Sequence, residues 1–114
     1  MTLDEYQKET IQFDVFPDKE YRITDVAFNE KILGLAGETG ETLDKFKKIM
    51  RDKNSNISAD DKREIAKELG DTLWYISAIG RYLGLGLDEI AQINIDKLAK
   101  RKRENKIHGS GDNR

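Results

Sequence analysis

The spacing of apolar residues is the sequence feature that most constrains the fold, because two long stretches carry them at alternating steps of three and four positions. That spacing places the apolar side chains on one face of an α-helix. The 114 residues include a single proline, and no run alternates apolar and polar residues as a strand would. We therefore predict an all-α chain with two long antiparallel helices. The two apolar stripes comprise Phe28, Ile32, Leu35, Thr39, Leu43, Phe46 and Met50, and then Ile65, Leu69, Leu73, Ile76, Ile79 and Leu83.

Capping residues give the expected helix boundaries. Thr2, Ser58 and Asp88 each precede a helical pattern as an N-cap would. Because the intervening loops are short, we expect a four-helix up-and-down bundle in a single domain, residues 1–104, followed by a glycine-rich tail, residues 105–114. The expected helices span residues 3–13, from 24 or 25 to about 51, from 59 to about 83, and from 88 to about 104.

A second apolar band on the third predicted helix needs a cover. Trp74, Ala78 and Tyr82 lie to one side of the main stripe. The first helix of the same chain would bury this band, and so would a second copy of the chain. The sequence favours neither, so oligomerisation is one of two open expectations.

Composition excludes several classes of protein. The chain has no cysteine and a single histidine, so a disulfide framework, thiolate metal sites and most zinc sites are excluded. Twenty Lys and Arg against 22 Asp and Glu give a formal net charge of -2, which provides no general attraction to nucleic acid. The longest uncharged, mostly apolar run, residues 72–80, is too short to span a bilayer, and the N-terminus is acidic where a signal peptide is basic. We expect a soluble, cytoplasmic protein with no membrane contact.

Two similar acidic motifs carry the chemical information. Glu38 and Glu41 fall in the second predicted helix, and Glu68 and Asp71 fall in the third; in each motif a glycine precedes the second acid. Residues three positions apart lie about 60° apart around a helix, so each pair points from one face. If the two helices pack stripe to stripe, all four carboxylates meet at the rim of one groove.

Electrostatic repulsion decides what such a group of acids requires. Two carboxylates about 5 Å apart repel by roughly 3 kcal/mol at an effective dielectric of about 20. Protonation or a bound cation would relieve this repulsion, and carboxylates are the hard oxygen ligands that suit Mg²⁺ or Mn²⁺. Ordinary salt bridges to Lys45, Lys48 or Lys67 are the alternative. We favour a Mg²⁺ site.

Glycines inside the second predicted helix support a site independently. Gly34, Gly37 and Gly40 together cost roughly 2.5 to 3 kcal/mol relative to alanine. Gly34 lies on the face of Glu38 and Glu41, one turn before them. We expect it to leave bare backbone where a side chain would block access to the acids.

A divalent cation with open coordination positions binds phosphate oxygens and lowers the pKa of a bound water. Positive charge should then lie near the acids to hold a phosphorylated ligand, and the sequence supplies basic and aromatic residues for it. Lys97 and Arg101 lie four positions apart on the fourth predicted helix, and Lys45 lies on the acidic face of the second. Asn94 offers an amide for a sugar hydroxyl or base edge, and Tyr75 offers a ring on which a base can stack. A solvated basic face is the alternative reading of the lysines and arginines.

The ordered combination of these motifs resembles the MazG-like all-α nucleoside triphosphate pyrophosphohydrolases. The resemblance rests on Glu38, Glu41, Glu68 and Asp71, followed by a helix with matching polar and basic positions, and it covers most of the chain. It implies that the four acids bind Mg²⁺ and form the catalytic centre. It also implies cleavage of a nucleoside triphosphate between the α and β phosphates, giving a monophosphate and pyrophosphate.

The same resemblance implies an oligomer and further substrate contacts. Family members assemble as homodimers or homotetramers with active sites at helix interfaces, and by resemblance Lys97 and Arg101 contact phosphates. Residues 108–114 are similar to a tail found in part of the family. Its glycines free backbone N–H groups for an anion-binding nest that Arg114 would complete.

Rival functions belong to other classes. A di-iron carboxylate bundle needs a histidine three residues after a glutamate on two helices, and His108 alone does not meet that requirement. A non-catalytic helical bundle that acts as an interaction or regulatory protein is the main alternative, and nucleic-acid binding ranks below it. Salt-sensitive binding without turnover would identify a nucleic-acid binder.

Overall fold

The computed structural model describes residues 1–17 and 20–113, and the described chain is all-α, as predicted. The expected helices all form close to their predicted bounds, and the first ends in a short 3-10 turn. Arg114, the predicted final residue of the anion-binding nest, lies outside the described residues. The helical elements are α1 (Leu3–Thr10), η1 (Ile11–Phe13), α2 (Val26–Asp52), α3 (Ala59–Tyr82) and α4 (Leu87–Arg103).

Two of the three predicted N-caps are confirmed. The hydroxyl of Thr2 accepts a hydrogen bond from the N–H of Glu5, and the hydroxyl of Ser58 accepts one from the N–H of Asp61. In both cases the acidic side chain bonds back to the capping residue, which completes a capping box. The sequence therefore fixes the starts of α1 and α3 locally.

The predicted N-cap of α4, Asp88, is wrong. The helix begins one residue earlier, at Leu87, with Gly86 as its N-cap. Since glycine has no side chain to cap the first turn, α1 supplies the acceptors. The N–H of Asp88 donates to Oδ1 of Asp4 at 2.9 Å, and the N–H of Leu87 donates to Oε1 of Gln7 at 3.2 Å. A tertiary contact replaces the expected local cap.

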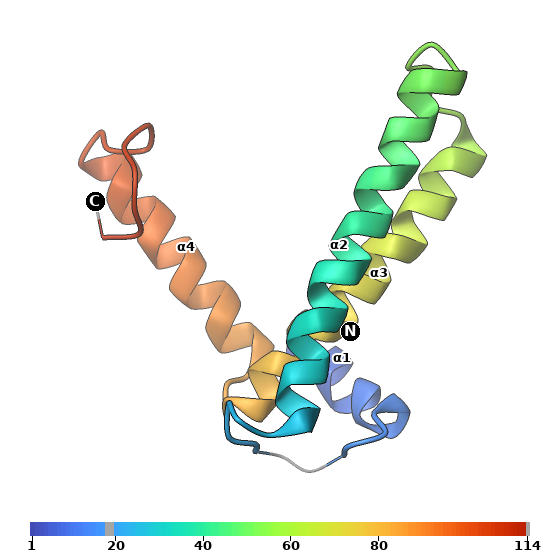
Figure 1. The fold of residues 1–114 in the computed structure, drawn as a ribbon. Helices are drawn as coiled ribbons and strands as arrows, with labels where there is room; N and C mark the ends of the chain where they lie inside the picture. Colours follow the sequence, from blue (N-terminus) through green and yellow to red (C-terminus); the bar gives the residue numbers. More distant parts are fainter. Residues whose placement is uncertain (18–19, 114) are drawn as a thin grey trace.

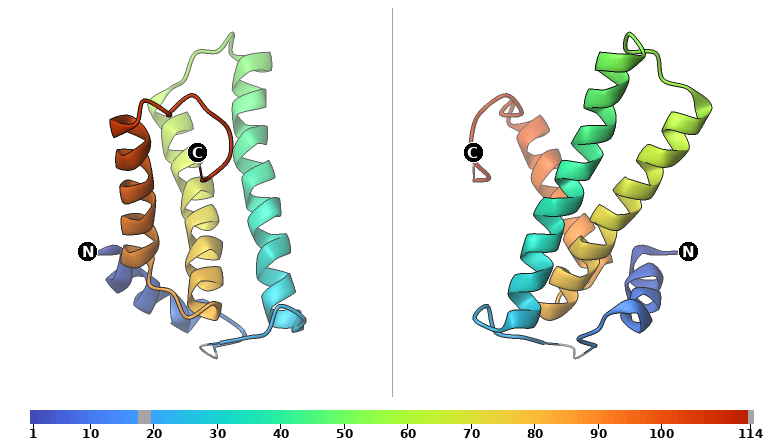
Figure 2. Two further views of the ribbon diagram at one scale, coloured as in Figure 1. Left: turned by 90° about the vertical axis from the view of Figure 1, so that its left-hand side faces the viewer. Right: turned by 45° about the vertical axis from the view of Figure 1, so that its right-hand side comes forward.

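The helices form an open V. α2 and α3 run antiparallel and pack side by side, and α1 lies across their base (Figure 1). α4 starts beside α1 and then diverges from the α2–α3 pair, as Figure 1 and the right-hand view of Figure 2 show. The radius of gyration is 16.9 Å, against roughly 13 Å for a compact domain of about 100 residues. A single chain therefore leaves long helix faces uncovered.

The apolar stripes make up much of those uncovered faces. Leu43 and Met50 on α2 are 63% and 60% exposed, and Leu69 on α3 is 54% exposed. In contrast, Thr42 and Ile49 of α2 are buried. The expectation that the helices pack stripe to stripe is therefore wrong over most of their length. Apolar periodicity marks a face that seeks a partner, but it does not say whether the partner is the neighbouring helix.

The core lies at the base of the V, around Tyr82. Its ring packs edge to face against Tyr21, with ring centres 4.7 Å apart, and also contacts Phe28. Tyr82 and Ala78 are each 2% exposed. The chain itself thus buries this part of the second apolar band on α3, which answers the question that the sequence left open for these two residues.

A buried ionic network ties the N-terminal segment to this core. The carboxylate of Asp14 accepts hydrogen bonds from the guanidinium of Arg81 and from the hydroxyl of Tyr82, and it lies 3.0 Å from Nζ of Lys31. Burial alone would raise the pKa of the Asp14 carboxyl, but the hydrogen bonds that it accepts outweigh burial and lower the pKa. Lys31 also lies over the ring of Trp74, so the network reaches the α3 face that carries the acids.

No described helix combines the length and the apolar character that crossing a bilayer requires.

Candidate metal centre between α2 and α3

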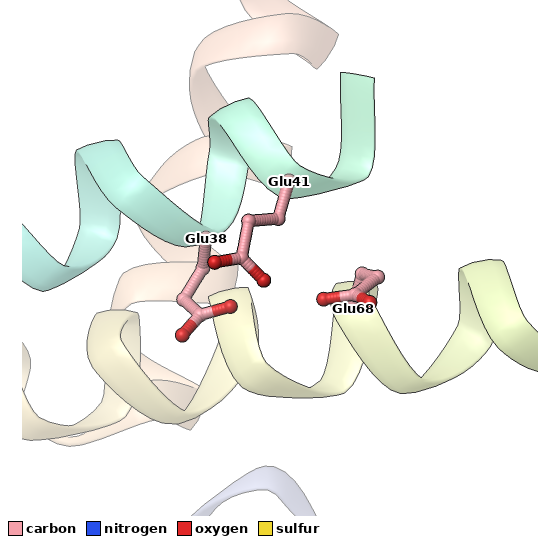
Figure 3. Close-up of side chains that lie close together, drawn as sticks. All are labelled: Glu38, Glu41 and Glu68. Atoms are coloured by element: carbon pink, nitrogen blue, oxygen red, sulfur yellow. The ribbon is translucent and has the colours of Figure 1, made fainter. Parts of the chain in front are cut away.

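Three of the four predicted acids converge in the seam between the long helices. Glu38 and Glu41 point from α2 toward α3, where Glu68 meets them (Figure 3). One carboxylate oxygen from each residue lies within 4.8 Å of the other two. Glu41 is exposed, whereas Glu38 and Glu68 are partly buried. Three carboxylates that share one small space are a donor set for a hard divalent cation.

The fourth acid, Asp71, lies beside this group and is not part of the cluster of three oxygens. It lines a cavity together with Glu38. Partial burial and the charges of the three other acids raise the pKa of Glu38 above its ordinary value. The neighbouring acids therefore add to the effect of burial, and each of them disfavours negative charge on Glu38.

Lys45 is the cation closest to the centre among those predicted for substrate. Its Nζ lies 3.3 Å from Oε1 of Glu68, and its side chain is 37% exposed. This salt bridge is the alternative to a metal site that the sequence offered, but it engages only one of the three carboxylates. Glu38 and Glu41 have no comparable ion pair among the described residues. Lys45 therefore partly neutralises the cluster and lies close enough to meet an anion bound there.

An aromatic cavity adjoins the acids. It has a volume of about 390 Å³ and is lined by Phe13 of η1, by Trp74 and Tyr75 of α3, and by Glu38 and Asp71. The rings of Trp74 and Tyr75 meet edge to face, with centres 5.0 Å apart. Flat aromatic walls beside carboxylates suit a ligand that has an aromatic ring and a charged part.

The expectation that Gly34 leaves open space beside the acids is wrong. The ring of Tyr75 lies against its backbone, where a Cβ would collide with the ring. A Cβ at Gly37 or Gly40 would meet nothing within 4 Å in this chain. The absence of a side chain at Gly34 thus allows the Tyr75 ring to pack between the helices, and the cavity that this ring lines adjoins Glu38 and Asp71.

The predicted residues of α4 are not brought to the acids within one chain. Asn94 is exposed, and Lys97 and Arg101 both pair with Asp112 of the tail. Because α4 diverges from the α2–α3 pair (Figure 1), the acids and these basic residues occupy separate arms of the V. Their predicted role as phosphate contacts stays a prediction.

The sequence that forms α2, α3 and α4 matches a known family. Residues 27–105 match the sequence model of the MazG nucleotide pyrophosphohydrolase domain. The matched stretch runs from the start of α2 to just beyond the end of α4. The chain belongs to the MazG family. The Gene 37 protein of Mycobacterium phage L5 is 43% identical to the chain over 82 residues, which is 72% of each protein. No solved structure matches the chain significantly.

The N-terminal segment precedes the MazG match, and sequence reasoning missed its contribution to the site. Phe13 lines the cavity beside Glu38, and Asp14 next to it anchors the segment to the core. Phe13 is 68% exposed, so its position is fixed by the neighbouring anchor and not by its own burial. Apolar periodicity cannot identify such a residue, because a single aromatic at the end of a short helix forms no repeating pattern.

Proposed function

We propose that this protein is a Mg²⁺-dependent pyrophosphohydrolase that cleaves a nucleoside triphosphate to the monophosphate and pyrophosphate. The observation that carries the proposal is the convergence of Glu38, Glu41 and Glu68 in a chain of the MazG family. Asp71 beside Glu38 is proposed as the fourth acid of the centre. The four acids would serve both as metal ligands and as the catalytic residues.

The residues present suit the proposed cation. All the donors are carboxylate oxygens, which Mg²⁺ prefers, and Mn²⁺ accepts the same set. Burial and the three neighbouring acids raise the pKa of Glu38, and a divalent ion bound there would stabilise its ionised form. The single salt bridge from Lys45 leaves room for such an ion.

The protein's residues divide the proposed work between them. A bound divalent cation would offset phosphate charge and make the attacking water more acidic. Glu41, the exposed member of the three, would accept the proton of that water, and Lys45, which pairs with Glu68, would hold a phosphate oxygen. Tyr75, with its neighbours in the aromatic cavity, would stack on the base.

The proposed active form is a homodimer or homotetramer in which α4 of one copy approaches the acids of another. Two observations support this arrangement. The open V leaves apolar side chains uncovered on both arms, among them Leu43 and Met50 on α2 and Ile93 on α4. The basic residues Lys97 and Arg101 lie on the arm that a single chain holds away from its own acids. A second copy would satisfy both features at once.

Turnover of a panel of nucleotides tests the function. Purified protein is incubated with Mg²⁺ and with canonical and modified nucleoside triphosphates, and pyrophosphate and orthophosphate are measured separately. We expect pyrophosphate and a nucleoside monophosphate from the wild type and no turnover from Glu38→Gln.

Glu64→Gln is the matched control for that substitution. Glu64 lies on α3 one turn before Glu68, and its carboxylate pairs with Lys67 at 2.7 Å, outside the cluster. This variant should retain activity. Release of orthophosphate would contradict the proposed bond cleavage, and absence of turnover on every nucleotide would favour the non-catalytic interaction protein.

A further inference from the structure

The two α4 cations predicted to hold phosphate are already engaged by the protein's own tail. Oδ1 of Asp112 lies 3.1 Å from Nζ of Lys97 and 3.1 Å from Nη2 of Arg101. The same guanidinium nitrogen donates to the carbonyl oxygen of Gly111 at 3.1 Å. One carboxylate oxygen thus bridges a lysine and an arginine, which is the contact that an oxygen of a bound phosphate would make.

The two cations differ in how far they are exposed beside the tail. Arg101 is only 6% exposed, although it lies on a charged helix end, and its Nε has no hydrogen-bond partner among the described residues. Lys97 remains partly accessible, and with Lys100, Asp112 and Asn113 it lines a cavity of about 470 Å³ between α4 and the tail. Lys97 is therefore the more accessible of the two cations that Asp112 bridges.

The contacts that hold the tail are easily exchanged. The side chain of Asp112 is 80% exposed, and residues 108–113 include no aliphatic or large aromatic side chain that would anchor the segment. Exposed ion pairs are weak and are screened by salt. A polyphosphate carries several charges and many acceptor oxygens, so it outcompetes a single carboxylate for the same cations.

We propose that Asp112 is a tethered competitor for the phosphate-binding cations of α4. Its carboxylate occupies Lys97 and Arg101 while no anion is bound, and a polyphosphate displaces it and releases the tail. The nature of the anion rests on the proposed function, whereas the competition rests on the contacts of Asp112 alone. The consequence is an intrinsic brake on binding, set by one exposed acid near the end of the chain.

Direct anion binding tests this inference without turnover. Binding of inorganic tripolyphosphate to the full chain is measured by calorimetry in the absence of divalent metal, for the wild type, Asp112→Asn and Asp96→Asn. Asp96 is the charge-matched control, because it lies on α4, is exposed and accepts a hydrogen bond only from Gln92 among the contacts described. We expect Asp112→Asn to bind about threefold to tenfold more tightly than the wild type, as loss of exposed ion pairs implies. Asp96→Asn should show a smaller gain, limited to the change in net charge.

Each other outcome overturns the inference. Weaker binding by Asp112→Asn would mean that Asp112 holds the cations in position for the anion, and equal binding by the variant and wild type would mean that Asp112 is not in the anion's path. A gain no larger than that of Asp96→Asn would reduce the effect to net charge. Thermal melting verifies that the variants are folded. If the wild type releases no pyrophosphate but Asp112→Asn still binds tripolyphosphate more tightly, the proposed function fails and the competition by Asp112 stands. If turnover is intact and Asp112→Asn binds no more tightly, only the competition fails.

Discussion

The ring of Tyr75 on α3 lies directly against the backbone of Gly34 on α2, in the space that a Cβ at this position would occupy. This contact occurs one helical turn before Glu38, so it sets how closely the two helices approach at the acidic cluster. Tyr75 also forms part of the aromatic cavity beside Glu38 and Asp71. The absence of a side chain at one residue therefore shapes both the seam and the cavity.

Gly34→Ala should destabilise the protein, and Gly37→Ala should stabilise it. Both glycines lie inside α2, where alanine is favoured by about 1 kcal/mol over glycine. A Cβ at Gly37 meets nothing within 4 Å, but one at Gly34 overlaps the Tyr75 ring and forces the helices apart, which costs about 1 to 3 kcal/mol. Urea unfolding of the two variants measures the difference. Equal stabilisation of both would show that Tyr75 moves aside freely.

Glu38→Gln should raise the melting temperature of the metal-free protein. The pKa of Glu38 is raised by partial burial and by the other acids, so its ionised form is disfavoured in the folded state. An amide keeps the shape and removes the charge. Melting curves in a chelator should therefore place the variant above the wild type, with Glu64→Gln as control. A lower melting temperature for Glu38→Gln would mean that the cluster holds the fold together through its own hydrogen bonds.

Acidification should stabilise the metal-free protein through Glu38 while weakening its binding of Mg²⁺. A folded-state pKa above the ordinary value contributes stability below that ordinary value, and the contribution is lost as pH rises through the raised pKa. Protons and the cation compete for the same carboxylate. The Mg²⁺-induced rise in melting temperature should thus shrink as pH falls toward the raised pKa. The test compares the Mg²⁺-induced rise in melting temperature of the wild type with that of Glu38→Gln across this pH range. A rise for the wild type that does not depend on pH would argue against Glu38 as a ligand.

The helix bounds and the shared face of Glu38 and Glu41 were predictable because their signals are local. Thr2 and Ser58 cap their helices with side chains close in sequence, and Glu38 and Glu41 share a face through helical geometry alone. The start of α4 was not predictable in this way, since Gln7 and Asp4 cap it from a helix about 80 residues away in sequence. Local rules succeed where both partners of a contact lie within one turn.

The position of α4, which carries Lys97 and Arg101, shows a second limit of prediction from sequence. The spacing of Lys97 and Arg101 correctly places them on one face of α4, where both contact Asp112. Spacing within a helix cannot say which way the helix leaves the preceding turn, and α4 diverges from the acids. The apolar stripes mislead for the same reason: Leu43 and Leu69 have the periodicity of core residues but face outward in a single chain.

Asp14→Ala should be among the most destabilising single substitutions outside the acidic cluster. The side chain of Asp14 is fully buried, and that of Lys31 is 1% exposed. Removing the carboxylate therefore takes away the buried counterion that Lys31 shares with Arg81, and it leaves Lys31 only the partly exposed carboxylate of Glu30. Breaking such a pair from one side costs roughly 3 to 5 kcal/mol. Urea unfolding measures this loss. Asp44→Ala is the control, because Asp44 pairs with exposed lysines on the surface of α2, and it should change stability far less.

Tyr82 should make the protein sensitive to alkali between pH 10 and pH 12. Burial, together with the hydrogen bond to Asp14, raises the pKa of the Tyr82 hydroxyl from 10.0 to about 12. Because the folded-state pKa is the higher one, its contribution to stability is complete below pH 10 and is lost as pH rises to 12, with a slope of at most roughly 1.4 kcal/mol per pH unit. Tyr82→Phe lacks the ionisable group. The difference in unfolding free energy between the wild type and this variant therefore reports the titration of Tyr82 and not that of the lysines, which titrate in the same pH range. Unfolding measured across this range should show the advantage of the wild type shrinking toward zero, and a constant difference from pH 9 to pH 12 would mean that the hydroxyl does not titrate in the folded protein.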